Sequence, residues 1–259
     1  MAELGTFWTG GPLGPIDLAS LRSFRRYGDC VTVYSPHPMT DLPEGVMWCD
    51  ASDVMPSHKI ILHRKSQSPA LHSDLFRYQL IEKTNKIWVD LDIIALRSFD
   101  FGTEWVFGYE TPGEVNGAIL QLPKSSLTLQ ALLAVRPNTK GIPPYLTGFR
   151  KAKYWVKGFG RGLPLDLWPW GSIGPRLLTH YLAEFDEIQH ALPISAFYSI
   201  PLGETARFAA PGALTRNDLP SDAWAVHLWG SKLRQVLQRN YSGHVPEGSF
   251  LDLALRDRI

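Results

Sequence analysis

The segment Ile87-Trp88-Val89-Asp90-Leu91-Asp92-Ile93-Ile94 is a hydrophobic run interrupted by two acids. Such a run is typical of a buried strand, in which residues i and i+2 project to the same face. The spacing therefore predicts that Asp90 and Asp92 lie side by side. Two neighbouring carboxylates removed from water repel each other, and a divalent cation between them offsets that cost. An exposed strand end with two solvated acids is the alternative interpretation.

The flanking sequence predicts an α/β fold with a parallel sheet. A strand over residues 5–8, a helix from Ile16 to Tyr27 that Asp17 caps, and a strand from Cys30 to Tyr34 follow one another, which is the order of a parallel α/β unit. A helix from Pro69 to Lys83 is apolar nearly all round, so we expect it to be buried. Further strands are predicted over 46–49, 105–110, 116–122, 196–200 and 223–229, and further helices over 125–135, 174–182, 231–239 and 249–256.

The composition excludes several function classes. The chain has 259 residues, 26 basic and 25 acidic, so its net charge of +1 provides no long-range field for nucleic acid or an anionic membrane. Cys30 and Cys49 lie in apolar stretches, where reduced thiols are expected. No signal peptide and no apolar run of about 18 residues is found. We therefore expect a cytoplasmic protein without a membrane span; peripheral membrane association is compatible with this sequence.

One domain is expected over residues 1–259. Residues 136–170 are rich in glycine, proline, basic and aromatic residues, which predicts long loops over one end of the sheet. Residues 223–259 are expected to form a C-terminal lid and helices.

Two segments together resemble a known family. His72-Ser73-Asp74-Leu75-Phe76-Arg77, followed by Trp88 to Asp92, resembles the S-D-x-x-R and Y/W-x-D-x-D signature of the retaining, DXD-containing glycosyltransferases of the GT-A fold. The similarity is to the mannosyltransferase/α-1,4-galactosyltransferase-like family 32 and, distantly, to the clostridial glucosylating toxins. Supporting segments are residues 7–10, 42–46, 116–120, 174–175 and 227–229. Asn85 and Lys86 stand where the family has two glycines.

The resemblance implies a GT-A-like (Rossmann-like) nucleotide-sugar-binding domain with a mixed central sheet and a helical C-terminal part. It implies a metal-dependent, retaining transfer of a hexose from a nucleotide-sugar, a UDP-sugar, to a glycan or glycolipid acceptor in surface polysaccharide biosynthesis. The implied cofactor is Mn²⁺ or Mg²⁺. With such an activity, the basic and aromatic loops of residues 136–170 could offer an acceptor platform for sugar rings or form ordinary surface. A phosphohydrolase in which Asp90 attacks phosphate, and a non-catalytic sugar-nucleotide or glycan binder on the same fold, are the alternatives.

The resemblance also implies roles for individual residues. Asp92 binds the metal directly, and Asp90 contacts the ribose or the metal through water. His227 is implied as the third metal ligand, Asp74 and Arg77 as residues that bind the donor sugar and its phosphate, and Trp8 as the residue that stacks on the nucleobase. Asn116 is implied to contact the donor sugar, and Trp229 and Ser231 to belong to a lid over the donor phosphates. Asp90, Asp92 and Arg77 are the catalytic candidates. A core histidine, a core tryptophan and a plain i,i+3 ion pair between Asp74 and Arg77 are the structural alternatives.

Overall fold

A computed structural model describes residues 1–259. Its centre is a six-stranded sheet in the order β3-β2-β1-β4-β7-β6. The strands are β1 Glu3–Phe7, β2 Cys30–Ser35, β3 Val46–Asp50, β4 Ile87–Val89, β6 Val106–Thr111 and β7 Glu114–Gln121. The first four run parallel, whereas β7 is antiparallel to both β4 and β6. The predicted α/β class with a mixed central sheet is therefore confirmed.

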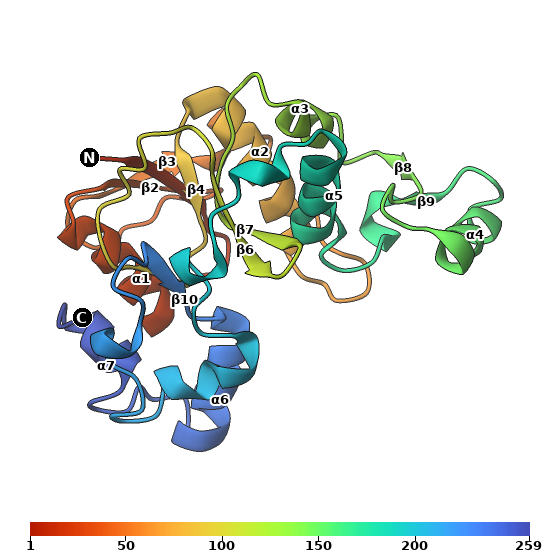
Figure 1. Cartoon of the computed structure of the whole chain (residues 1–259). Helices are drawn as coiled ribbons and strands as arrows, with labels where there is room; N and C mark the ends of the chain where they lie inside the picture. The colour runs from red at the N-terminus through yellow and green to blue at the C-terminus, as the bar shows by residue number, and fades with distance from the viewer.

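Helices surround this sheet, and two small sheets lie outside it, one of them far out on the right-hand projection (Figure 1). The helices are α1 Pro15–Arg26, α2 Ala70–Thr84, α3 Leu127–Leu133, α4 Gly148–Lys157, α5 Leu177–Glu184, α6 Gly230–Tyr241 and α7 Phe250–Leu255. The small sheets pair β5 Ile93–Ala95 with β10 Ala225–His227 and β8 Lys140–Gly141 with β9 Leu163–Pro164. None of the helices has the length and apolar character needed to cross a lipid bilayer.

The sheet separates two hydrophobic clusters because its side chains alternate between faces. In β4, Ile87 and Val89 belong to the cluster with α1, α6 and α7, whereas Trp88 belongs to the cluster with α2, α3 and α5. Trp88 packs near Phe76 of α2, with ring centroids 6.3 Å apart. The apolar faces of β4 are thus covered on both sides, which explains its uninterrupted hydrophobic sequence.

Strand order places a crevice between β1 and β4. From β1 the chain first adds strands on the β2 side and later on the β4 side. In open α/β sheets such a reversal leaves room for a ligand beyond the carboxyl ends of the two central strands. The residues after Phe7 and after Val89 therefore face a common opening.

The prediction of one continuous strand over residues 87–94 is wrong. Strand β4 ends at Val89 and β5 begins at Ile93, so Asp90, Leu91 and Asp92 form a turn. The chain changes partners here, because β4 pairs with β1 and β7 whereas β5 pairs with β10 of the C-terminal part. The two acids lie near each other through this turn and not through the alternation of a strand.

Other boundaries also differ from the predictions. Residues 136–170 contain α4 and the β8–β9 pair in addition to loops, and residues 196–200 form no strand but follow a 3-10 turn at Ile194–Ala196. The helix expected from residue 174 begins at Leu177, because Gly174 has non-helical dihedral angles within a π-turn over Ser172–Arg176. Gly14, and not Asp17, is the N-cap of α1; the Asp17 carboxylate accepts a hydrogen bond from the Gly14 N–H at 2.9 Å. Cys30 and Cys49 are free thiols.

Candidate functional site

A cavity of about 390 Å³ opens at the crevice between β1 and β4. Trp8, Thr9 and Gly10, which follow β1, form one wall, and the turn Asp90–Asp92 forms another. The start of α2 and the side chains of Asp17, Arg77 and Arg234 complete the lining. Sequence positions far apart along the chain thus converge where the topology predicts a ligand.

Arg77 occupies the centre of a buried polar network. Its Nη2 lies 3.1 Å from Asp74 Oδ1 and 3.5 Å from Asp90 Oδ1, and its Nη1 donates to the Gly117 carbonyl at 2.6 Å. The guanidinium also lies over the Trp88 ring at 5.0 Å. The Arg77 and Asp74 side chains are only 7% and 10% exposed. A planar guanidinium with several fixed donors is suited to join two carboxylates in this way.

Burial dominates the protonation of the two carboxylates that contact Arg77. It raises the pKa of Asp74 to about 6, although the charge of Arg77 acts in the opposite direction. Burial also raises the pKa of Asp90; the charge of Arg77 acts to lower it, and the charge of Asp92 raises it further. One guanidinium therefore does not fully compensate two carboxylates in this environment.

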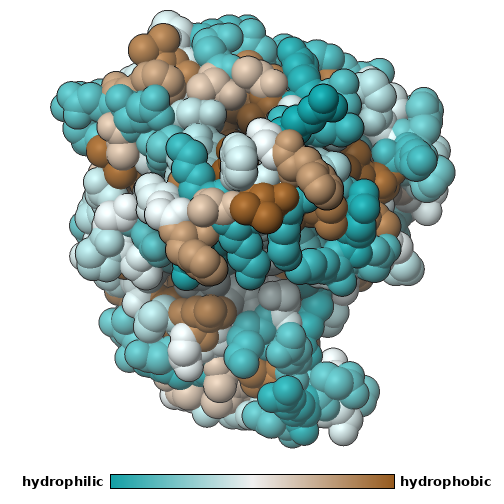
Figure 2. Space-filling view, turned by 90° about the vertical axis from the view of Figure 1, so that its right-hand side faces the viewer, coloured by the Kyte–Doolittle hydropathy of each residue, from teal (hydrophilic) through white to brown (hydrophobic).

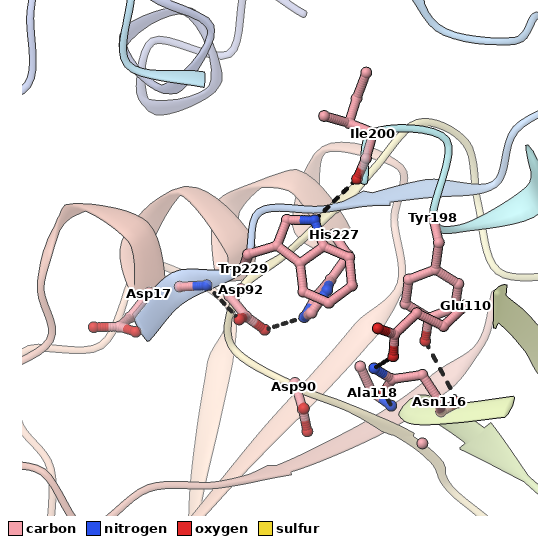
Figure 3. Close-up of polar contacts among 12 residues, drawn as sticks. Asp17, Asp90, Asp92, Glu110, Asn116, Ala118, Tyr198, Ile200, His227 and Trp229 are labelled. Carbon is pink, nitrogen blue, oxygen red and sulfur yellow. Dashed lines mark hydrogen bonds and ion pairs between the residues drawn. The ribbon is translucent and has the colours of Figure 1, made fainter. Parts of the chain in front are cut away.

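Asp92 is held by the C-terminal part of the chain (Figure 3). Its Oδ2 accepts a hydrogen bond from the Gly230 N–H, the first residue of α6, at 2.7 Å, and its Oδ1 lies 3.3 Å from His227 Nε2. Burial would raise the pKa of Asp92, but the imidazole and the N–H outweigh it and lower the value to about 2. Asp92 is therefore ionised, and it complements the positive end of the α6 dipole.

His227 lies behind Asp92 and is not part of the cavity lining. Burial would lower the pKa of its imidazole, but the charges of Asp92 and Asp90 outweigh this and raise it. The Nδ1 atom is buried and has no hydrogen-bond partner. In this arrangement the imidazole orients the Asp92 carboxylate.

Four further candidates have different surroundings. Trp8 lines the cavity and also an adjoining cavity of about 480 Å³ beside the end of β2. Asn116 donates to Glu110 Oε2 at 2.7 Å and accepts from the Ala118 N–H at 2.8 Å. Trp229 is buried in the core and donates to the Ile200 carbonyl at 2.9 Å (Figure 3), and Ser231 is exposed. Asn116, Trp229 and Ser231 do not line the cavity in this structure.

The ion pair between Asp17 and Arg234 was not anticipated from the sequence. Both residues line the cavity, and Arg234 Nη2 lies 2.6 Å from Asp17 Oδ1. Burial raises the pKa of Asp17, with Arg234 acting against it. The sequence predicts Asp17 only as a helix cap, and no local pattern connects it with a residue 217 positions later.

The donor set suits a hard cation in charge but does not form a complete metal site. Asp17, Asp74, Asp90 and Asp92 lie in or beside the cavity. These four carboxylates outnumber the cationic groups beside them, which are the guanidinium groups of Arg77 and Arg234 and the imidazole of His227. No three His, Cys, Asp or Glu side chains stand close enough to hold a metal alone. Mg²⁺ is usually held by one or two carboxylates together with water and substrate phosphates, and Asp90 and Asp92 fit that role.

Comparisons with known proteins give little further information. No protein-family model matches the chain, and no curated protein matches it. Among solved structures, the chain is similar to one titled "PaToxG Glycosyltransferase", with 13% sequence identity and a TM-score of 0.43 over 70% of this chain and 68% of that chain. A likeness at this level does not assign a family or an activity.

Proposed function

We propose that the chain is a metal-dependent retaining glycosyltransferase of the GT-A type. The donor is a nucleotide-sugar, a UDP-sugar, which binds in the cavity between β1 and β4. The acceptor is a glycan or glycolipid of surface polysaccharide assembly, an assignment that rests on the family resemblance alone.

The central observation in support is the contact of Arg77 with both Asp74 and Asp90. These are the residues of the S-D-x-x-R and D-x-D segments that resemble the family signature. In the fold they meet in one buried network beside a cavity at the topological switch point, where α/β sheets bind nucleotides. An ion pair between Asp74 and Arg77 that only stabilised α2 would not require Asp90, in the turn after β4, as a third partner.

The residues of this chain have distinct roles in the proposal. Arg77, fixed by Asp74, Asp90 and the Gly117 carbonyl, offers positive charge to the donor. Trp8, between the main cavity and the cavity beside β2, offers an aromatic face to the base. Asp74, held in place by Arg77, accepts hydrogen bonds from sugar hydroxyls.

Asp90 and Asp92 would hold the Mn²⁺ or Mg²⁺ ion together with the donor phosphates. When bound, this ion neutralises the charge that develops on the leaving nucleoside diphosphate. His227 and the Gly230 N–H keep Asp92 ionised and oriented, which is the usual function of partners behind a metal ligand. They also tie the C-terminal part of the chain to the donor site.

The direct experiment measures UDP release from a panel of UDP-sugars with Mn²⁺, compared with samples treated with EDTA. We expect metal-dependent release by the unaltered chain and at least a 100-fold loss in Asp92→Asn, because one removed catalytic contact of this kind costs about 10²–10³. Asp92→Asn keeps an oxygen for the Gly230 N–H, so the fold is preserved. The matched control is Asp166→Asn, because Asp166 forms a partly exposed ion pair with Arg64 and does not line the cavity.

Three results would contradict the proposal. UDP release by Asp92→Asn at the same rate as by the unaltered chain would show that the Asp92 carboxylate has no part in the reaction. Release of inorganic phosphate from phosphomonoesters, without UDP release, would favour the phosphohydrolase. Saturable binding of UDP-sugars without turnover on any acceptor or water would favour the non-catalytic binder.

A further inference from the structure

The segment 136–170, which we call the arm, projects from the side of the molecule (Figure 1). Its base is well packed. Trp168 is buried and donates from Nε1 to the Gly141 and Leu163 carbonyls, and Asp166 pairs with Arg64 outside the arm. Helix α4 at the far end has no buried residue. The arm is thus an anchored projection whose helix has no buried residue.

The hydrophobic residues of this helix face solvent. Ten large hydrophobic side chains of the chain are exposed, and the arm contributes five of them, including all four aromatic ones. These five are Phe149, Trp155, Val156, Phe159 and Trp170, which are 57–94% exposed. Figure 2 looks onto this side of the molecule and shows hydrophobic atoms among hydrophilic ones. Clustered exposed hydrophobic residues of this kind mark an interaction surface.

The arm is also strongly basic, although the whole chain is nearly neutral. It holds seven of the 26 basic residues and one of the 25 acidic residues, a net charge of +6 that leaves −5 for the rest. Arg150, Lys151, Lys153 and Lys157 are all on α4, which has no acid. The net charge of +1 for the whole chain conceals this separation.

Charged and hydrophobic residues lie on different sides of α4. At 100° per residue, Phe149, Ala152, Trp155 and Val156 fall within an arc of roughly 120°, and the four basic residues fall outside it. Tyr154, the only residue of the helix body that is half-buried before Gly158, turns toward the rest of the molecule. The apolar arc therefore faces outward, the reverse of a helix that packs on its own core.

We propose that the arm binds the surface of an anionic phospholipid membrane. The apolar arc and Phe159 enter the interface, as in interfacial amphipathic helices. Lys151 and Lys153, which border the arc on its two sides, contact the lipid phosphates, and the other basic residues of the arm add to the electrostatic attraction. Single-stranded nucleic acid is less well matched, because its binding sites place cations and aromatic rings along one groove. The proposal does not depend on the transferase activity.

The test is flotation of the full chain with vesicles of phosphatidylcholine containing about 30 mol% phosphatidylserine at about 0.1 M NaCl. We expect binding to these vesicles, little binding to pure phosphatidylcholine, and release at about 0.5 M NaCl. Lys151→Glu/Lys153→Glu/Lys157→Glu should weaken binding by about 100-fold or more, because each basic residue near the surface contributes about 1 kcal/mol.

A second variant and a matched control make the test specific. Phe149→Ser/Val156→Ser/Phe159→Ser should also weaken vesicle binding while far-UV circular dichroism stays unchanged, since none of these side chains is buried. Lys124→Glu/Arg239→Glu/Arg258→Glu changes the net charge equally at exposed positions outside the arm and should bind normally. Equal binding to both vesicle types, an unaffected serine variant, or preferential binding to single-stranded homopolymer RNA would overturn the proposal.

Discussion

Replacing Arg77 by methionine should lower the free energy of unfolding by about 3–5 kcal/mol at pH about 8. Asp74 is 10% exposed and contacts Arg77 at 3.1 Å, and removal of one partner from a buried ion pair costs this much because the other charge stays behind. Methionine has a similar reach, so little of the loss comes from a cavity. Urea unfolding followed by circular dichroism measures the change.

The cost should depend on pH in a defined direction. The pKa of Asp74 is already raised to about 6 by burial, and loss of Arg77 raises it further. The folded state then binds a proton that the unfolded state releases, so stability falls as pH rises through this range. The deficit of Arg77→Met should therefore be smaller at pH about 5 than at pH about 8.

A double variant and an exposed pair complete the experiment. Asp74→Asn in the Arg77→Met background removes the more buried of the two orphaned carboxylate charges and should recover about 1.5–3 kcal/mol. Arg64→Met, at a pair whose side chains are 58% and 29% exposed, should cost less than about 1 kcal/mol. Absence of rescue, or equal losses at Arg77 and Arg64, would refute the reasoning.

Three other predictions concern protonation, capping and ligand binding. Burial lowers the pKa of His72 to about 4, so the stability that its neutral imidazole contributes is present above pH about 6.5 and is lost as pH falls toward 4. In urea unfolding, the free energy of unfolding of the unaltered chain should fall by about 2 kcal/mol over this range because of His72. This part of the loss should be absent in His72→Gln. Glu187 accepts hydrogen bonds from Ser126, Leu127 and Thr128 at the start of α3, and Glu187→Ala should cost about 1–2 kcal/mol in the same assay. UDP should raise the melting temperature with Mn²⁺ present and should not do so after EDTA treatment; a shift of equal size in both samples would argue against a shared cation.

Local pattern was sufficient for the parallel half of the sheet and for its buried helix. The sequence pattern predicts β1, β2, β4 and the helix α2 correctly. These elements are covered on both faces, so their sequences are hydrophobic nearly throughout. The same reasoning failed at Asp90 and Asp92. Periodicity cannot show that the chain leaves one sheet after Val89 and joins another at Ile93, because the partner strand β10 lies 130 positions later.

Long-range contacts also limited the prediction of the site. Asp74, Arg77 and Asp90 were connected through a motif, and the structure brings them together. Arg234 was missed because its partner Asp17 is remote and its own helix gives no signal. Trp229 is predicted to belong to a lid, whereas in this structure its indole is buried and donates a hydrogen bond to the Ile200 carbonyl. Hydrophobicity alone cannot distinguish a tryptophan of a lid from a tryptophan of the core.

The remote partners of Asp92 have a consequence for how the protein is made. His227 and Gly230 follow Asp92 by more than 130 residues, so a nascent chain emerging from the ribosome carries Asp92 long before these partners are synthesised. The first 220 or so residues can form the central sheet, yet the pocket stays unfinished until β10 and α6 arrive. The proposed transferase activity would then appear late in synthesis, and a fragment truncated before β10 should lack it.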